Sequence, residues 1–157
     1  MIAGSIEELD ENAQFVRIKN SFPKHDVYVK LEGLNTAGSV KLKTAIALVD
    51  SLEELHGLQP GGWVIESSSG SLGIALSAVC ARRGYKLTIV TDLNANARSI
   101  AHMRALGAEV EIVQSLDTAG GFLGTRLARV RELVEMPGGP LWTCLLYTSD
   151  AADDMQC

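Results

Sequence analysis

The sequence predicts an α/β protein: a three-layer arrangement in which helices cover both faces of a parallel sheet. Short runs rich in β-branched and aliphatic residues alternate along the chain with longer segments of helical periodicity. The short runs are apolar almost throughout, which is typical of strands that are buried on both faces. Alternation of this kind favours parallel strands joined by right-handed crossovers through helices.

The expected elements follow one another from residue 27 to residue 134. Glycine marks the helix ends, because Gly57, Gly84 and Gly107 each follow a segment of helical periodicity. Strands are expected at residues 27–31, 63–66, 87–91 and 110–113, and helices at residues 39–55, 72–83, 95–106 and 123–134. No internal repeat or low-complexity tract interrupts this order.

Composition limits the classes of partner. Hydrophobic residues make up 46% of the chain and charged residues 21%, which is the mix of a globular domain. A net charge of -5 offers no positive field to nucleic acid or an anionic membrane, and aromatic residues, at 5%, are too few for base stacking. No run reaches the roughly 18 apolar residues of a membrane span, and no signal peptide is recognisable. The sequence therefore predicts a cytoplasmic protein without nucleic-acid or membrane partners.

Cysteine and histidine provide no further chemistry. Cys80, Cys144 and Cys157 are odd in number and irregularly spaced, so no disulfide framework is expected. Cys80 lies among small helix residues and is expected to be buried and inert. No metal site is expected, because the three histidines lack metal-ligand spacing; they are His25, His56 and His102.

A lysine follows a small-residue loop at the start of the first helix, where Ser39 is the expected N-cap. Helical geometry places Lys41 on the apolar side of this helix and Lys43 on the opposite side, which faces water. The apolar arc around Lys41 comprises Leu42, Ala45, Ile46, Leu48, Val49, Leu52 and Leu55. Two interpretations remain open at this point. Either the lysine stem snorkels and its ammonium lies in water, or the amine is desolvated and is a nucleophile able to form a Schiff base.

A serine-rich loop, Ser67-Ser68-Ser69-Gly70-Ser71, lies between a predicted strand and a predicted helix. Such a junction exposes unpaired N–H groups and the positive end of a helix dipole, and the hydroxyl groups add donors. The loop is either an anion cradle for a phosphate or carboxylate, or an ordinary N-capped turn. It lacks the glycine-lysine pair of a Walker loop and the spacing of a dinucleotide-binding loop.

Both motifs resemble the cysteine synthase family, which comprises fold-type II enzymes that depend on pyridoxal 5′-phosphate (PLP). The segment Asn-Thr-Ala-Gly-Ser-Val-Lys at residues 35–41 is similar to the family signature N-P-x-G-S-[VI]-K, whose lysine binds PLP covalently. Residues 68–73 resemble T-S-G-N-T-G, which grips the substrate α-carboxylate. Residues 103–110 and, more weakly, residues 12–18 match further family segments in order. The departures are Thr36 for proline, Ser71 for asparagine and Leu72 for threonine, with Leu42 and Lys43 for the aspartate and arginine after the lysine.

The resemblance implies a β-replacement reaction on O-activated L-serine, with O-acetylserine or O-phosphoserine as donor and sulfide or an amine as nucleophile. Lys41 would be the catalytic and cofactor-binding lysine, and Ser71 a further cofactor contact. Ser68, Ser69 and Gly70 would bind the carboxylate of a small amino-acid substrate. One alternative is a specialised 2,3-diaminopropionate-type synthase of siderophore or antibiotic biosynthesis, and another is a PLP lyase or dehydratase. An alternative from a different class is a non-catalytic anion-binding domain.

The resemblance also predicts the domain organisation. Residues 1–34 are expected to belong to a large PLP domain, and residues 35–143 to form a small, movable α/β domain of a homodimeric enzyme. The family's glycine-rich phosphate loop and its pyridine-nitrogen contact are expected beyond residue 143, so this chain is expected to be an inactive fragment. Residues 144–157 resemble the translation of a sequencing-library adapter, and we interpret them as a non-native tail.

Overall fold

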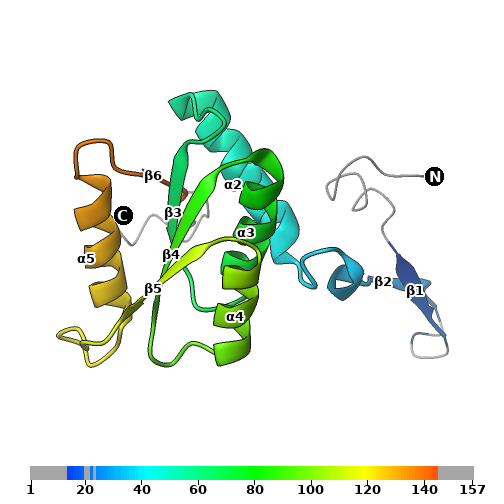
Figure 1. Cartoon of the computed structure of the whole chain (residues 1–157). Coiled ribbons are helices and arrows are strands. Elements are labelled where there is room, and N and C mark those ends of the chain that lie inside the picture. Colours follow the sequence, from blue (N-terminus) through cyan, green and yellow to red (C-terminus); the bar gives the residue numbers. More distant parts are fainter. Residues whose placement is uncertain (1–13, 20–21, 23, 145–157) are drawn as a thin grey trace.

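A computed structural model, which describes residues 14–19, 22 and 24–144, confirms the α/β architecture (Figure 1). Its centre is a four-stranded sheet of order β5-β4-β3-β6, in which every neighbouring pair is parallel. The strands are β3 (Trp63–Ser67), β4 (Lys86–Asp92), β5 (Glu109–Val113) and β6 (Leu141–Trp142).

Helices cover both faces of this sheet, so the predicted three layers are confirmed (Figure 1). One face carries α2 (Lys41–His56), α3 (Ser71–Arg83) and α4 (Ala97–Ala105), and the other carries α5 (Leu123–Val134). The bounds of α5 agree with the predicted helix at both ends. None of the helices in the described part of the chain is long and apolar enough to cross a lipid bilayer.

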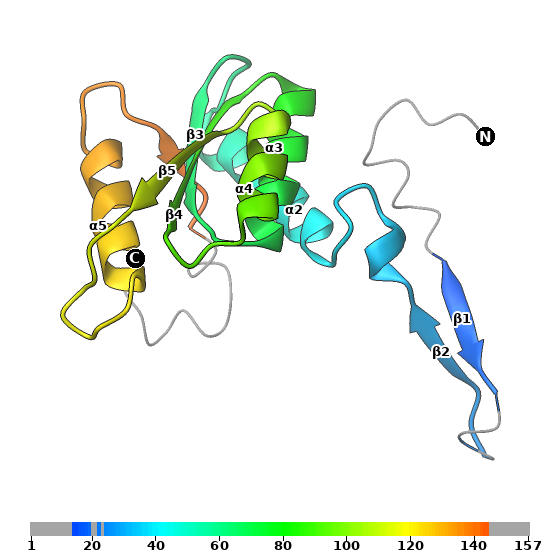
Figure 2. The ribbon, with the colours of Figure 1, turned by 60° about the horizontal axis from the view of Figure 1, so that its bottom comes forward.

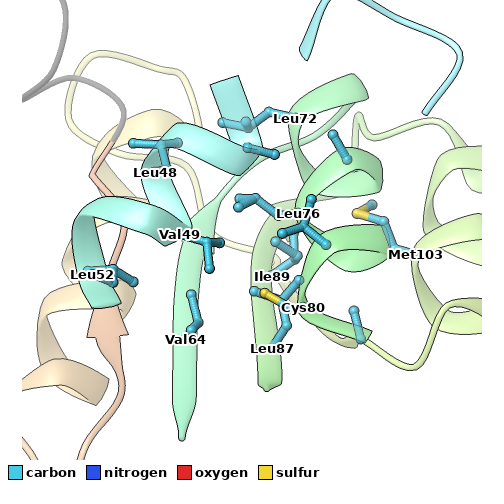
Figure 3. Close-up of a cluster of buried hydrophobic side chains, with 14 of the residues drawn as sticks. Leu48, Val49, Leu52, Val64, Leu72, Leu76, Cys80, Leu87, Ile89 and Met103 are labelled. Atoms are coloured by element: carbon cyan, nitrogen blue, oxygen red, sulfur yellow. The ribbon is translucent and has the colours of Figure 1, made fainter. Parts of the chain in front are cut away.

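The hydrophobic core is divided by the sheet into two clusters. The larger cluster lies on the α2–α3 side, where Val64 and Ile89 of the sheet pack with Leu76 of α3 and Met103 of α4 (Figure 3). Their alternate strand neighbours point to the other face, and Ile65 and Val90 pack there against α5 residues Val130 and Leu133. Because strands β3 and β4 are covered on both sides, apolar residues on both of their faces are buried, and the buried polar residues Glu66, Thr88 and Thr91 lie among them.

Strand β6 was not predicted, and it changes the topology. It pairs with β3 through only two positions, Val64 with Leu141 and Ile65 with Trp142. Two residues after a proline- and glycine-rich turn carry no periodic pattern, so only pairing in the folded chain identifies them as a strand. Since β4 and β5 lie on one side of β3 and β6 lies on the other, the strand order reverses between β3 and β6.

The strand expected at residues 27–31 does not join the parallel sheet. As β2 (Val27–Lys30) it pairs antiparallel with β1 (Phe15–Ile18), which the sequence analysis did not assign, in a separate two-stranded hairpin. Figures 1 and 2 show this hairpin to one side of the body, connected to α2 through the 3-10 helix η1 (Glu32–Leu34). A short connection between Ile18 and Val27 makes the antiparallel hairpin less costly in loop entropy than pairing with a distant strand of the parallel sheet.

The end of α2 corrects one expectation. Leu55 was expected on the buried arc, but 75% of it is exposed. The chain turns at Gly57, whose φ is 64°, and the N–H of Leu58 then donates to the Leu52 carbonyl at 3.2 Å. This Schellman-type ending brings Leu58, which is buried, onto the apolar side of the last turn, so Leu55 is left facing water.

Candidate active site

The loop before α2 is organised by one asparagine side chain. The Asn35 side-chain oxygen accepts hydrogen bonds from the N–H groups of Ala37, at 3.0 Å, and Ser39, at 3.3 Å. Its amide nitrogen donates to the Ser39 carbonyl at 2.6 Å. Gly38, with φ of 67°, has the left-handed conformation that favours glycine. The asparagine and the glycine of the motif therefore define the turn from which α2 begins.

The expected N-cap at Ser39 is corrected by the structure: α2 begins at Lys41, two residues later than expected, and Val40 takes the N-cap position without a side-chain hydrogen bond. The Ser39 hydroxyl accepts a hydrogen bond from the Lys41 N–H at 3.3 Å. This contact pairs one of the N–H groups that the first turn of a helix leaves free. The backbone of Lys41 is thus tied to the Asn35 turn.

Lys41 is the first residue of α2 and is partly buried. The buried residues Leu42 and Ala45 lie beside it, while Lys43 points outward, as the helical geometry predicts. Among the described residues, the Lys41 amine has no hydrogen-bond or ion-pair partner. Lys43, by contrast, lies 3.5 Å from a carboxylate oxygen of Glu32. The segment therefore presents one partly buried lysine whose amine no carboxylate of the described residues neutralises.

Ser68 lies inside the serine-rich loop rather than on its surface. It is buried, and its hydroxyl oxygen accepts hydrogen bonds from the N–H groups of Gly73, at 2.9 Å, and Gly70, at 3.4 Å. These contacts make Ser68 an internal cap for the first turn of α3. In this structure Ser68 therefore stabilises the N-terminus of α3.

Gly73 allows this packing. A Cβ atom at position 73 would lie 2.5 Å from the Met103 sulfur and 3.3 Å from the Ser68 hydroxyl oxygen. The absence of a side chain lets the first turn of α3 approach both α4 and the loop. Here a motif glycine serves close packing rather than an unusual backbone angle.

The outer part of the loop remains open. Ser69 and Ser71 are exposed, and no atom lies within 4 Å of a Cβ built on Gly70. Among the described residues, no partner accepts from the N–H groups of Ser69, Ser71 or Leu72. Free N–H groups at the N-terminus of a thirteen-residue helix are suited to binding a carboxylate or phosphate.

Topology brings the two motifs to the same edge of the sheet. The serine-rich loop leaves the carboxyl end of β3, and α2 runs toward the amino end of β3, so the N-terminus of α2 lies toward the carboxyl edge. The strand order reverses beside β3, and ligands of open α/β sheets bind at the carboxyl ends of strands next to such a reversal. The structure thus places the Lys41 turn and the serine-rich loop at the edge of the sheet where ligands of such folds bind.

Glu66 at the same edge was missed by the sequence analysis. This buried carboxylate accepts hydrogen bonds from the Ser67 N–H at 2.7 Å, from the Trp142 indole N–H at 3.4 Å and from the Thr143 hydroxyl. It therefore ties the start of the serine-rich loop to the segment after β6. The available signal was a charged residue directly after an apolar strand, Trp-Val-Ile-Glu.

A small cavity of about 120 Å³ adjoins Glu66 at the point where the strand order reverses. Leu72 of α3, Leu123 and Leu127 of α5, and Trp142 form its apolar walls. Its polar lining includes Ser67, whose buried hydroxyl has no hydrogen-bond partner among the described residues. The carboxyl edge of β3 is therefore not fully packed.

A buried ion pair lies under the same edge. The Arg126 guanidinium of α5 is 3.4 Å from a carboxylate oxygen of Asp92 at the end of β4. The other oxygen of Asp92 accepts from the Asn94 N–H at 2.8 Å and so shapes the turn that leads to α4. The pair joins α5 to the carboxyl end of the sheet.

Comparison with known proteins agrees with this geometry. A family model described as "Pyridoxal-phosphate dependent enzyme" matches residues 6–152. Two curated proteins, both named N-(2-amino-2-carboxyethyl)-L-glutamate synthase, match over 144 residues, which is 90% of this chain. The protein from Cupriavidus metallidurans is 37% identical, and the protein from Ralstonia nicotianae is 36% identical. This chain spans only 42% and 43% of their respective lengths.

Solved structures show the same fold. A hydrogen sulfide-producing enzyme from Fusobacterium nucleatum superposes with a TM-score of 0.80 at 29% identity, over 93% of this chain and 47% of that chain. An O-ureido-L-serine synthase superposes with a TM-score of 0.77 at 31% identity, over 91% of this chain and 44% of that chain. The match therefore extends over nearly all of this chain and less than half of each relative.

Proposed function

This chain belongs to the family of pyridoxal-phosphate-dependent enzymes, and from that premise we propose that its protein catalyses β-replacement on an O-activated L-serine. The family's cofactor is PLP. The proposal is carried by one observation: the partly buried residue Lys41, whose amine has no partner among the described residues, lies at the edge of the sheet where the serine-rich loop presents free N–H groups. The reaction needs one amine for the cofactor and one anion site for the substrate carboxylate.

The described residues fit the cofactor at the position of Lys41. An amine without a carboxylate partner is free to bond to the aldehyde carbon of PLP, and the Asn35–Ser39 turn fixes where the helix presents that amine. When bound, PLP withdraws electrons from the α-carbon of an attached amino acid and so acidifies its α-hydrogen. Ser71, at the exposed start of α3, is the residue that we propose as a further cofactor contact.

Lys41 would have two roles. It would hold the cofactor, and once a substrate amino group has taken its place the same amine would be free to accept the α-proton. Lys41 is partly buried as a residue, and among the described residues no carboxylate occupies its amine, so the amine would be available for both roles. The β-substituent would then leave with its bonding electron pair, and a nucleophile would add at the β-carbon.

The serine-rich loop would bind the substrate carboxylate. The exposed Ser69 hydroxyl and the free N–H groups at the start of α3 can donate to it, and the open space over Gly70 leaves room for its approach. Ser68 would support the loop from beneath, where its oxygen accepts two N–H groups while its hydroxyl hydrogen can still be donated. Binding energy gained at this loop would orient the α-hydrogen toward Lys41.

For the nucleophile, the two curated relatives favour an amine. Both are named for the joining of a 2-amino-2-carboxyethyl group to L-glutamate. We propose the same type of product, made from O-phosphoserine or O-acetylserine, which corresponds to a specialised diaminopropionate-type synthase. Sulfide is the second candidate nucleophile, because one structural relative is named a hydrogen sulfide-producing enzyme.

The cofactor assignment is tested by treating the complete protein encoded by the locus with PLP and borohydride and mapping the labelled peptide. We expect label on Lys41 and its loss in Lys41→Ala, while Lys86→Ala, which removes an exposed lysine from the opposite end of β4, keeps it. Label spread over exposed lysines without preference for Lys41 would instead support a non-catalytic anion-binding domain.

The nucleophile is tested on the complete protein encoded by the locus. Purified enzyme is supplied with each donor together with L-glutamate or sulfide, and products are identified by mass. The glutamate adduct is expected to dominate. Cysteine as the main product would make the protein a cysteine synthase, and pyruvate alone would indicate a lyase or dehydratase.

We further propose that the β1–β2 hairpin belongs to a larger PLP domain, with residues 35–143 as the smaller, movable one. The exposed apolar hairpin and the partial coverage of the relatives support this division. The homodimeric state and cytoplasmic location expected from the sequence remain predictions. The adapter-like segment comprises residues 144–157. Apart from Cys144, it lies outside the residues that the structure describes.

A further inference from the structure

Three lysines surround the turn that leads into α2, and one carboxylate binds two of them. The Lys30 amine, at the end of β2, lies 2.6 Å from an oxygen of Glu32, and the Lys43 amine lies 3.5 Å from the same oxygen. The other oxygen of Glu32 accepts from the Asn35 amide at 3.5 Å. Among the described residues, Lys41 is bonded to no carboxylate, although it lies only two residues before Lys43.

These contacts hold Glu32 in its charged form. The hydrogen bond from Lys30 lowers the pKa of the Glu32 carboxyl below its ordinary value, and the charges of Lys30 and Lys43 add to this against the opposing effect of burial. A carboxylate next to an amine favours the ammonium form of that amine. An ammonium has no lone pair and cannot attack an aldehyde, so an ion pair suppresses the nucleophilicity of the amine within it.

The geometry creates a problem of selectivity that Glu32 can solve. PLP condenses with any accessible unprotonated amine, and Lys43 is the most accessible of this group, with 53% of its side chain exposed. The Lys30 side chain is 22% exposed and the Glu32 side chain 24% exposed. The partly shielded Glu32 carboxylate, which pairs with the amines of Lys30 and Lys43, would direct the cofactor to the amine of Lys41.

We propose that Glu32 is a selectivity residue, which pairs with Lys30 and Lys43 so that PLP bonds to Lys41. This inference rests on the proposed role of Lys41 as the cofactor lysine. Glu32 touches neither cofactor nor substrate and acts through the two lysines that it neutralises. Its contact with the Asn35 amide links this charge pairing to the turn that orients α2.

The test measures how a covalent label is distributed among the three lysines. In the complete protein encoded by the locus, the amine nitrogen bonds to the aldehyde carbon of PLP with loss of water, and hydride from borohydride reduces the resulting C=N bond to a stable amine. Peptide mapping then gives the share of label on Lys41 and on Lys30 plus Lys43. The variants are Glu32→Gln, which removes the charge, and Glu32→Asp, which restores it on a shorter stem. The control is Glu54→Gln, which removes a charge from the exposed face of α2.

We expect Glu32→Gln to raise the ratio of label on Lys30 plus Lys43 to label on Lys41 by about two- to fivefold, the range for loss of exposed ion pairs. Glu32→Asp should restore most of the wild-type ratio, and Glu54→Gln should leave it unchanged. High salt, which screens exposed pairs, should shift the wild-type ratio in the same direction as Glu32→Gln and does not depend on the folding of a variant.

The outcomes separate the two proposals. A wild-type map led by Lys41 and unchanged by both Glu32→Gln and salt overturns the role of Glu32 and leaves the proposed function intact. A wild-type map without preference for Lys41 overturns both, because no selectivity then exists to protect. If Glu54→Gln changes the label ratio as much as Glu32→Gln does, the inference is also overturned. The change would then come from the lower net negative charge and not from the contacts of Glu32.

Discussion

The α/β body and the β1–β2 hairpin consist of similar residues but bury them very differently. In the body, Ile65 and Val90 point to one face of the sheet and Val64 and Ile89 to the other, and all four are fully buried. In the hairpin, Val16 and Val29 face each other across the two strands, and each is 45% exposed. The same aliphatic side chains are a core in one region and a surface in the other.

The difference teaches that strand pairing alone does not make a stable unit. By its register, the hairpin gathers Val16, Ile18, Val27 and Val29 on one face, and no described element covers that face. A two-stranded ribbon is marginal in water unless it packs against something else. The body contains its own core, whereas the apolar side chains Val16 and Val29 of the hairpin are exposed.

The largest expected effect is on the ionisation of Cys80, a thiol buried in the core of the body. Burial raises the pKa of the Cys80 thiol from 9.0 to about 12, with the Arg83 charge opposing the shift. At pH 9 the folded chain should form Cys80 thiolate about five-hundredfold less than the unfolded chain. Because the folded pKa is the higher one, this contribution to stability is complete below pH 9 and is lost as the pH rises toward 12.

The measurement is the rate of Cys80 modification by a thiol reagent, with peptide mapping to separate it from the other cysteines. The control is the same reaction in concentrated guanidinium chloride. Modification of the native chain at the unfolded rate would show that the core opens freely and would remove the contrast with the hairpin.

A second prediction compares two leucines of opposite burial. Leu76 is fully buried between α3 and the sheet, so Leu76→Ala should lower the free energy of unfolding by about 2–5 kcal/mol. Leu55→Ala, at the exposed end of α2, should change it by less than about 0.5 kcal/mol. Urea denaturation gives both values. Equal losses would mean that Leu55 packs in solution, as the helical arc from sequence predicted.

A third prediction separates the two serines of the loop. Ser68→Ala removes the acceptor for the N–H groups of Gly70 and Gly73 and should lower stability by about 1 kcal/mol. Ser69→Ala removes an exposed hydroxyl and should leave thermal and urea unfolding unchanged. If both substitutions were neutral, Ser68 would not cap α3.

The smallest effect is expected in the hairpin. Val29→Ala deletes two methyl groups from a half-exposed side chain and should cost less than about 0.5 kcal/mol in this chain. In the complete protein the same change should cost more, because the proposed larger domain would cover that face. The two urea-unfolding experiments form the comparison, and equal costs would count against the proposed domain division.

The sequence predicted the local elements well because their signals are local. Glycine at positions 57, 84 and 107 ended helices where expected, since each takes a positive φ. The apolar runs around Val64 and Ile89 marked strands buried on both faces. Lys41 could be assigned to the inner side of α2 because helical periodicity needs no knowledge of the rest of the fold.

The candidate site was only half predictable. The Asn35–Lys41 segment was recognised as a lysine motif and the Ser67–Ser71 segment as a candidate anion loop. From the residues alone, however, Lys41 could equally be a snorkelling lysine, and the serine-rich loop could be an ordinary N-capped turn. The Ser68 hydroxyl turns inward and accepts the N–H groups of Gly70 and Gly73, whereas Ser69 is exposed. Gly73 in turn lies close to Met103 of α4, which is far away in the chain, and periodicity cannot report such a contact.

By itself, then, the sequence determined the helices and most of the strands, the apolar face of most of them, and the amine and the loop that are candidates for chemistry. The tertiary structure decided the rest: that residues 27–30 leave the sheet for a hairpin, that the two residues of β6 reverse the strand order beside β3, and that Glu66 and Glu32 bind their partners. The physical reason is range. Propensity and periodicity act within a few residues, whereas pairing, burial and charge neutralisation depend on neighbours that only the folded chain brings together.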